Sequence, residues 1–211
     1  MRSCELRASA RRRAARARPG GSSCTPRPQG SSQPASLHAD TALLKRMYVL
    51  VFIEHGTRRM HLGGVTANPT GEWAVQQARN LALTLGERFE SFRFLIRDRG
   101  SNFTQSFDAV FQANGTRILQ TAVQASRMNA TCERLLGTLR RELLDRMLIL
   151  SEAHLRPVLI EYQAHYNTAR PHRALQLQPP RPDHPVADLS QERVKRRPVL
   201  GGLRNECERT A

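Results

Sequence analysis

Between residues 48 and 123 the apolar residues fall into short runs separated by turn signals, a pattern typical of β-strands. The run at 48–54 meets a turn signal at His55-Gly56, and a partner run follows at 59–66, which together predict a β-hairpin. The run FRFLIRD begins at Phe92 and stops at Asp98, so it predicts a buried strand. A further short strand is expected at 117–123.

Elsewhere the apolar residues recur every three or four positions, which predicts helices. Thr70 is a candidate N-cap for a helix that stops at Gly86, and a shorter helix is expected to stop at Gly115. A third helix carries Glu133 and is expected to run to about Leu148. Ser151 can cap a fourth, in which Pro157 predicts a kink or a start at 156–157. The apolar stripes of the two longest helices are Leu135, Leu136, Leu139, Leu143, Met147 and Leu148, and Leu155, Val158, Leu159, Tyr162 and Tyr166.

A short first strand that carries Asp40 and ends near Thr41 is expected before the hairpin. The order is then three strands followed by alternating helices and strands, which indicates an α/β fold with a mixed sheet flanked by helices. At 211 residues the chain has room for one ordinary domain and tails. We expect a core at 37–178, an Arg-rich arm at 1–36, and a Pro-rich then basic extended tail at 179–211.

The arm contains eight Arg, no Lys and one acid, without apolar periodicity, so we expect disorder there. Three interpretations stay open. The arm could neutralise DNA phosphates. It could be a transit peptide, which is also rich in Arg and Ser. It could be a non-native start joined to a domain that begins near Leu37, which is the interpretation we favour.

The net charge indicates what kind of partner the chain binds, and its cysteines indicate the cellular compartment. The net charge is +15 and the pI is near 11.3, which favours a polyanion such as nucleic acid, with a purely solubilising charge as the alternative. No apolar run is long enough to predict a membrane span or a membrane partner. The four cysteines form neither a zinc pattern nor a disulfide framework, so we expect a reduced, cytoplasmic location.

Two carboxylates are placed for metal chemistry. Asp98 stands where a strand ends, and Glu133 follows 35 positions later on a predicted helix. If that helix packs against the strand, the two could converge into the oxygen-rich site that Mg²⁺ prefers. In the alternative interpretation Asp98 caps the turn into RGSN and Glu133 is an ordinary surface residue.

An ordered set of motifs joins these carboxylates. Asp40 comes first, RDRGSNF carries Asp98, and NATCER carries Glu133. In this set of motifs the chain resembles the integrase-type transposases of bacterial insertion sequences, within the retroviral-integrase superfamily. The flanking segments carry the same resemblance: VFIEHGTRRMHLGGVTANPTGEW, GTLRRELLDRMLIL, YNTARPHRAL and RRPVLGGLRNE. The resemblance covers about residues 37 to 207.

The resemblance implies a ribonuclease H-like fold in which Asp40, Asp98 and Glu133 form a catalytic triad that binds two Mg²⁺ or Mn²⁺ ions. It implies cleavage of DNA by water, then attack of the freed 3′-hydroxyl on target DNA. Glu54 is the rival first carboxylate, but the hairpin of the family pattern follows Asp40. The implied partners are the DNA of the element ends and of the target, with a homo-oligomer as the active form and a location at the nucleoid. Candidate DNA contacts are Arg127, Asn129, Arg134, Arg140 and Arg141, with a solvated charged face as the alternative.

The chain also departs from the family pattern. Where the family has a longer apolar strand, this chain has only SLHAD, preceded by SSQPA. We therefore expect the sheet to lack a central strand, and Asp40 to lack the strand that would hold it in register. Ala122 and Ser126 replace common prolines, and a DNA-recognising helix-turn-helix is not recognisable upstream. Two functions therefore stay open: a metal-dependent DNA strand-transferase, or an inactive remnant that binds DNA or intact transposase. A third function, that of a ribonuclease H or a resolvase, is disfavoured, because the YNTARPHRAL motif belongs to the transposase pattern.

Overall fold

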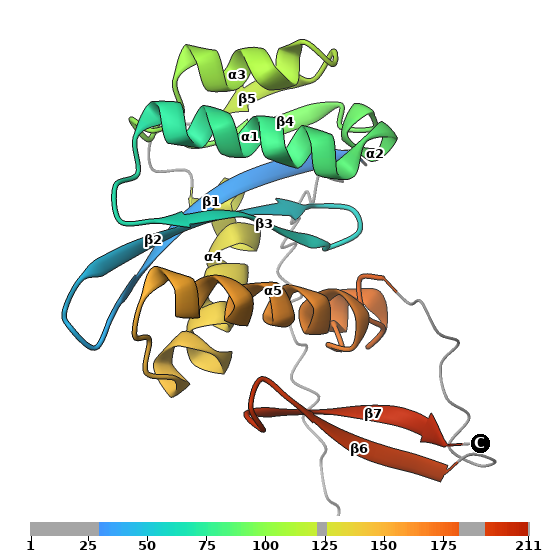
Figure 1. Cartoon of the computed structure of the whole chain (residues 1–211). Coiled ribbons are helices and arrows are strands. Elements are labelled where there is room, and N and C mark those ends of the chain that lie inside the picture. Colours follow the sequence, from blue (N-terminus) through green and yellow to red (C-terminus); the bar gives the residue numbers. More distant parts are fainter. Residues whose placement is uncertain (1–29, 122–125, 182–192, 211) are drawn as a thin grey trace, which may run out of the picture.

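A five-stranded sheet lies between two layers of helices in the computed structural model (Figure 1), which describes residues 30–121, 126–181 and 193–210. The strand order is β3-β2-β1-β4-β5, with β1 antiparallel to β2 and parallel to β4. This confirms the predicted mixed sheet flanked by helices. The strands are β1 Ser31–Asp40, β2 Arg46–Glu54, β3 Met60–Thr66, β4 Phe94–Arg97 and β5 Arg117–Gln120.

The helices form one layer on each face of the sheet (Figure 1). On one side lie α1 (Gly71–Leu85), α2 (Glu87–Glu90) and α3 (Gln105–Gln112), and on the other α4 (Ser126–Glu142) and α5 (Glu152–Thr168). The predicted caps are present: the side chain of Thr70 accepts from the Trp73 amide, and that of Ser151 from the His154 amide. No described helix combines the length and apolar character needed to cross a membrane.

Alternating residues of the central strands supply two separate cores, as the period of a strand requires. One set packs beneath α4 and α5, and the other packs beneath α1 and α3 against a group of phenylalanines. The first set from β1 and β2 is Ala35, Leu37, Ala39, Met47, Val49, Val51 and Ile53. The second core contains Leu50, Phe52, Leu95, Phe89, Phe107 and Phe111.

The first strand is the main difference from expectation. Instead of a short strand near Asp40, β1 has ten residues and is the central strand of the sheet. Its ladder with β2 runs from Ser32 opposite Glu54 to Asp40 opposite Arg46. The predicted boundary at residue 36 therefore falls inside β1, and the sheet keeps its central member. Residues 1–29 of the predicted arm lie outside the described residues.

Pro34 explains why this strand was hard to predict. Proline cannot donate to a ladder, so it usually argues against a central strand. The carbonyl of Ser31 accepts from the His55 amide on the β2 side, so the backbone of the even-numbered residues turns toward β4. The β4 ladder ends at Ser32, and Pro34 consequently stands where no donor is needed.

Helix α4 is shorter than predicted, and α5 begins directly after its predicted cap, Ser151. Helix α4 ends at Glu142, short of 148, because Leu143 leaves helical geometry before a turn at Leu144–Arg146. Helix α5 starts at Glu152 and continues through Pro157, so the alternative start at 156–157 is not observed.

Part of the segment expected to be an extended tail forms a hairpin. Strands β6 (Arg193–Val199) and β7 (Arg204–Thr210) pair with each other and contact α4 and α5. The contacts are a hydrogen bond between the His165 ring and Glu206, at 2.8 Å, and an ion pair of Arg204 with Glu142, at 3.1 Å. Residues 182–192 of the predicted tail lie outside the described residues.

Candidate active site

Asp98 is exposed immediately after β4. Its Oδ1 accepts a hydrogen bond from the Gly100 amide at 3.0 Å, so it does cap the following turn. The neighbouring Arg97 is buried and donates to the Asp98 carbonyl at 3.0 Å. Arg97 also binds both carboxylate oxygens of Asp108 on α3, at 2.6 Å each. The turn that carries Asp98 is thus held from within the protein.

The pairing of β1 with β4 shows which residue of β1 lies beside Asp98. Ser31 is opposite Phe94 and Ser32 is opposite Leu95. The same parallel register, continued past the last paired residue, sets Asp98 level with Ala35. Leu95 belongs to the core under α1 and α3, so alternation turns Phe94, Ile96 and then Asp98 toward the opposite face, where α4 lies.

Helix α4 runs along β1, as two contacts show. The Gln33 amide donates to Asn129 Oδ1 at 2.9 Å, and the guanidinium of Arg140 donates to the carbonyl of His38 at 3.2 Å. From Asn129 to Arg140 the helix advances eleven steps and rises about 16 Å, and the five steps from Gln33 to His38 span about the same length of strand. Glu133, four residues after Asn129, therefore lies level with about the second residue after Gln33, which is Ala35. The carboxyl group of Glu133 is exposed.

Asp40 is not brought to this place. It lies at the far end of β1, five residues beyond Ala35, which is about 16 Å along a strand. As an even-numbered residue of β1 it also points away from the face that packs against α4. Its carboxylate binds Arg46 at 3.0 Å, and this hydrogen bond lowers the pKa of Asp40.

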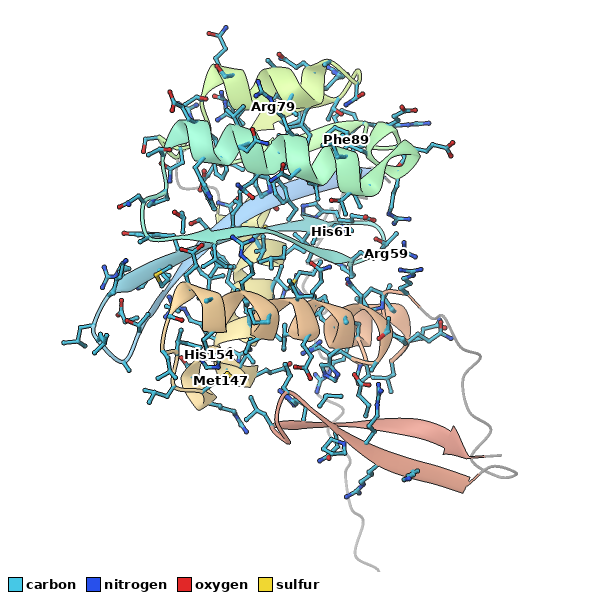
Figure 2. The ribbon with its side chains drawn as sticks, in the orientation of Figure 1. Arg59, His61, Arg79, Phe89, Met147 and His154 are labelled. Atoms are coloured by element: carbon cyan, nitrogen blue, oxygen red, sulfur yellow. The ribbon has the colours of Figure 1, made fainter. Side chains whose placement is uncertain are left out.

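Glu54, the rival first carboxylate, is occupied by other groups. Its buried side chain accepts from Arg88 at 2.6 Å and contacts the ring of His61 at 2.8 Å, with Thr57 as a third partner. His61 lies on β3, beside the β2–β3 turn (Figure 2). Burial pushes the pKa of Glu54 upward, but the hydrogen bonds from His61, Arg88 and Thr57 outweigh it and hold the pKa at about 2.

The carboxylates therefore do not fit a site for two metal ions. Asp98 and Glu133 lie level with each other on one face, whereas Ala35 occupies the nearest position of β1. Throughout the part of the chain that the structure describes, no three Asp, Glu, His or Cys residues gather closely enough to hold a metal ion.

The candidate DNA contacts divide into two groups. Arg134 and Arg141 are exposed and, being seven residues apart, project from the same side of α4, about a quarter turn from Glu133. Asn129 and Arg140 instead bind β1, so they hold the helix on the sheet. The side chain of Arg127 and the loop residue Ala122 lie outside the described residues.

Gln33 is a site residue that the sequence did not reveal. It is buried, and its amide oxygen lies 2.9 Å from His55 Nε2 while its nitrogen binds Asn129. Its carbonyl also lies 3.9 Å from the Cys132 thiol. Gln33 thus joins β1, the end of β2 and α4 beside the two carboxylates. A Gln among Ser and Pro gave no apolar signal that could have marked it.

We expect Gln33→Leu to lower the free energy of unfolding by about 1–3 kcal/mol, because it withdraws a buried hydrogen-bond partner from both His55 and Asn129. Urea unfolding followed by circular dichroism measures the change. Gln76→Leu is the matched control, since Gln76 bonds Asn80 on the exposed face of α1. Equal effects of the two substitutions would contradict a structural role for Gln33.

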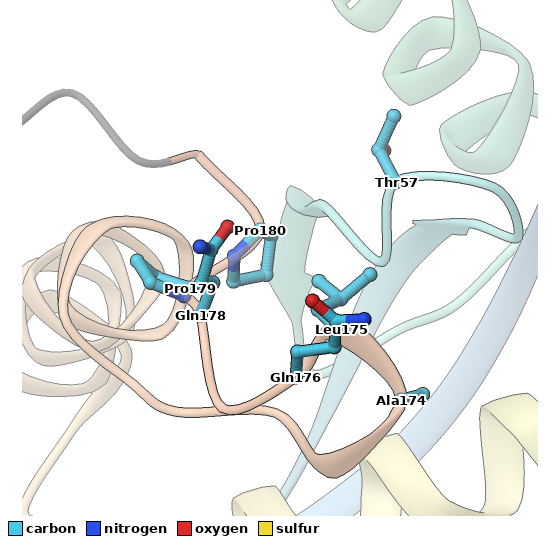
Figure 3. A pocket seen from close by; sticks show the side chains of 7 residues that line it. All are labelled: Thr57, Ala174, Leu175, Gln176, Gln178, Pro179 and Pro180. Carbon is cyan, nitrogen blue, oxygen red and sulfur yellow. The ribbon is translucent and has the colours of Figure 1, made fainter. Parts of the chain in front are cut away.

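A pocket whose lining includes none of the candidate site residues is shown in Figure 3. It is formed by Thr57 of the β2–β3 turn and by the segment after α5: Ala174, Leu175, Gln176, Gln178, Pro179 and Pro180. None of these lining residues has an ionisable side chain. The pocket therefore provides no acid, base or metal ligand.

Comparisons with known proteins match part of the chain to a family model and most of it to solved structures. The family model of the integrase core domain matches residues 114–180, which include Glu133. No curated protein sequence matches the chain. The HTLV-2 integrase catalytic core domain in complex with magnesium, in its trimeric form, has a TM-score of 0.56 at 13% identity, over 72% of this chain and 93% of that one. A chain of the simian T-cell lymphotropic virus intasome in complex with PP2A regulatory subunit B56 gamma has a TM-score of 0.56 at 14% identity. The match covers 87% of this chain and 67% of that one.

These structural likenesses confirm the predicted ribonuclease H-like fold. They are too distant in sequence to carry an activity. The integrase core domain match lies on the segment that contains α4, with Glu133, and the YNTARPHRAL motif. The chain thus combines an integrase core domain match over residues 114–180 with a fold similar to that of retroviral integrase catalytic cores.

Proposed function

We propose that this chain acts in DNA transposition or integration as a DNA-binding integrase core that does not itself cut or join strands. The observation that carries the proposal is that the integrase fold is retained while Ala35, and no carboxylate, lies level with Asp98 and Glu133. Of the two functions that the sequence left open, this favours the remnant that binds DNA or pairs with intact transposase. Descent from a bacterial insertion sequence is part of the proposal.

The charge distribution supports DNA as the partner. The net charge of +15 favours phosphates, and Arg134 and Arg141 project from the exposed side of α4. The HTLV-2 core is described in trimeric and dimeric forms, and the simian virus chain belongs to an intasome. By analogy we propose that copies of this chain associate with one another, or with intact transposase, on DNA at the nucleoid.

Binding to labelled duplex DNA tests the proposal. We expect affinity to fall steeply between 50 and 200 mM salt, because each neutralised phosphate contributes about −0.9 to the slope of log K against log salt. Arg134→Gln and Arg141→Gln should each reduce that slope by about one. Arg79→Gln is the matched control: Arg79 is exposed on α1, on the opposite face of the sheet (Figure 2), and its loss should leave the slope unchanged.

A cleavage assay on the same samples separates the two functions. With Mg²⁺ or Mn²⁺ the native chain should cut labelled DNA no faster than Asp98→Asn. Metal-dependent cleavage that is lost in Asp98→Asn would overturn the proposal in favour of a strand-transferase. A salt-independent affinity, or one that Arg79→Gln reduces as much as Arg134→Gln does, would overturn DNA binding by α4.

A further inference from the structure

Three backbone positions from separate elements lie level with one another on one face of the sheet: Ala35 in the middle of β1, Asp98 after β4 and Glu133 on α4. The register of β1 with β4 relates the first two. The contacts of Asn129 with Gln33 and of Arg140 with His38 relate β1 to α4. Two of these three positions carry a carboxylate, and the third carries a methyl group.

The environment of Ala35 explains why a carboxylate could be accommodated there only with a cation. Ala35 is 8% exposed and belongs to the core cluster on the α4 side, together with Leu37 and Cys132. A charged group in such a place is costly unless it is paired or coordinates a metal. A carboxylate at this position would face two others, so it would repel them until a cation entered.

We propose that Ala35 occupies the position of a missing metal ligand, and that Ala35→Asp alone converts this face into a divalent-cation site with Asp98 and Glu133. The inference rests on the proposed function, since it names the residue that accounts for the absent strand-transfer chemistry. It also revises the expected role of Asp40. The position that needs a carboxylate beside Asp98 is that of Ala35, which lies five residues before Asp40 in β1 and on the opposite face of the strand.

The test is Mn²⁺ binding by the full chain without DNA, measured by calorimetry, together with the thermal midpoint in Mn²⁺ and in a chelator. Even groups that only hydrogen-bond to a metal ligand are worth about 10- to 100-fold in affinity, so Ala35→Asp should bind Mn²⁺ at least about tenfold more tightly than the native chain. Its thermal midpoint should be lower than native in chelator and should rise with Mn²⁺, because the metal binds only the folded state.

Ala39→Asp is the matched control. Ala39 is also 8% exposed and lies on the same face of β1, four residues after Ala35. Ala39→Asp and the double variant Ala35→Asp/Asp98→Asn should gain no Mn²⁺ affinity. Equal gains at positions 35 and 39 would overturn the proposal, as would native binding as tight as that of Ala35→Asp.

Folding failure is also informative. Ala35→Asn has nearly the same size as Ala35→Asp but no charge. If Ala35→Asn folds and Ala35→Asp stays unfolded even in Mn²⁺, no cation reaches the position and the proposal fails. If neither folds, the position has no room for a ligand and the proposal fails too. DNA binding by the native chain is measured in a separate experiment. If the native chain does not bind DNA, the proposed function fails, but the Mn²⁺ affinity of Ala35→Asp still tests the metal-ligand proposal.

Discussion

Asp108→Asn is expected to lower the free energy of unfolding by about 3–5 kcal/mol, because it leaves the charge of Arg97 buried without its counter-ion. Arg97 and Asp108 have only 6% and 12% of their side-chain surfaces exposed, and both oxygens of the carboxylate accept from the guanidinium. Urea unfolding at neutral pH, followed by circular dichroism, measures the loss. The same substitution should free the turn that carries Asp98, since Arg97 also donates to its carbonyl.

Two controls separate burial of the charge from simple loss of an ion pair. The double variant Arg97→Met/Asp108→Leu removes both charges and should recover much of the loss, since replacing a whole buried pair by apolar side chains is often close to neutral. Asp40→Asn breaks the exposed pair with Arg46 and should change the unfolding midpoint little. If Asp108→Asn and Asp40→Asn cost the same, Arg97 does not depend on this buried partner.

Much of the fold could be predicted because its signals are local. The hairpin of β2 and β3 was evident from two apolar runs about a turn signal, and α1 from an apolar stripe between Thr70 and Gly86. Strand β1 carried no such signal, because Ser31, Ser32, Gln33 and Pro34 are poor strand formers. They are strand residues because they pair with β2 and β4, and those contacts are remote in sequence.

The candidate site could be predicted only in part, for a related reason. Asp98 and Glu133 stand where a strand ends and where a helix begins to cross it, and both places follow from local patterns. Which residue of β1 lies beside them depends on register, which spacing along the chain does not reveal. A shift of one residue turns a side chain to the other face. Asp40 has the expected place in the order of motifs, but it lies on the other face and beyond the reach of Asp98 and Glu133.

Glu54→Gln is expected to lower the free energy of unfolding at neutral pH by about 3 kcal/mol and to make the protein less sensitive to acid. The pKa of Glu54 is about 2 in the folded protein against an ordinary value of 4.5, because the hydrogen bonds from His61 and Arg88 outweigh the opposing effect of burial. A lowered carboxyl pKa stabilises the fold above the unfolded value, and that stabilisation is lost as the pH falls from about 4.5 toward 2.

The difference in unfolding free energy between native and Glu54→Gln should therefore be constant above about pH 5 and shrink by about 3 kcal/mol by pH 2, at 1.36 kcal/mol for each pKa unit. Urea unfolding across this range measures it. Glu72→Gln, which changes an exposed carboxylate in the first turn of α1, should run nearly parallel to the native chain. A Glu54→Gln difference that stays constant down to pH 2 would mean that Glu54 is not held ionised by Arg88 and His61. Its carboxylate would then be free for another partner, in place of serving as the anchor that ties β2 and β3 to α2.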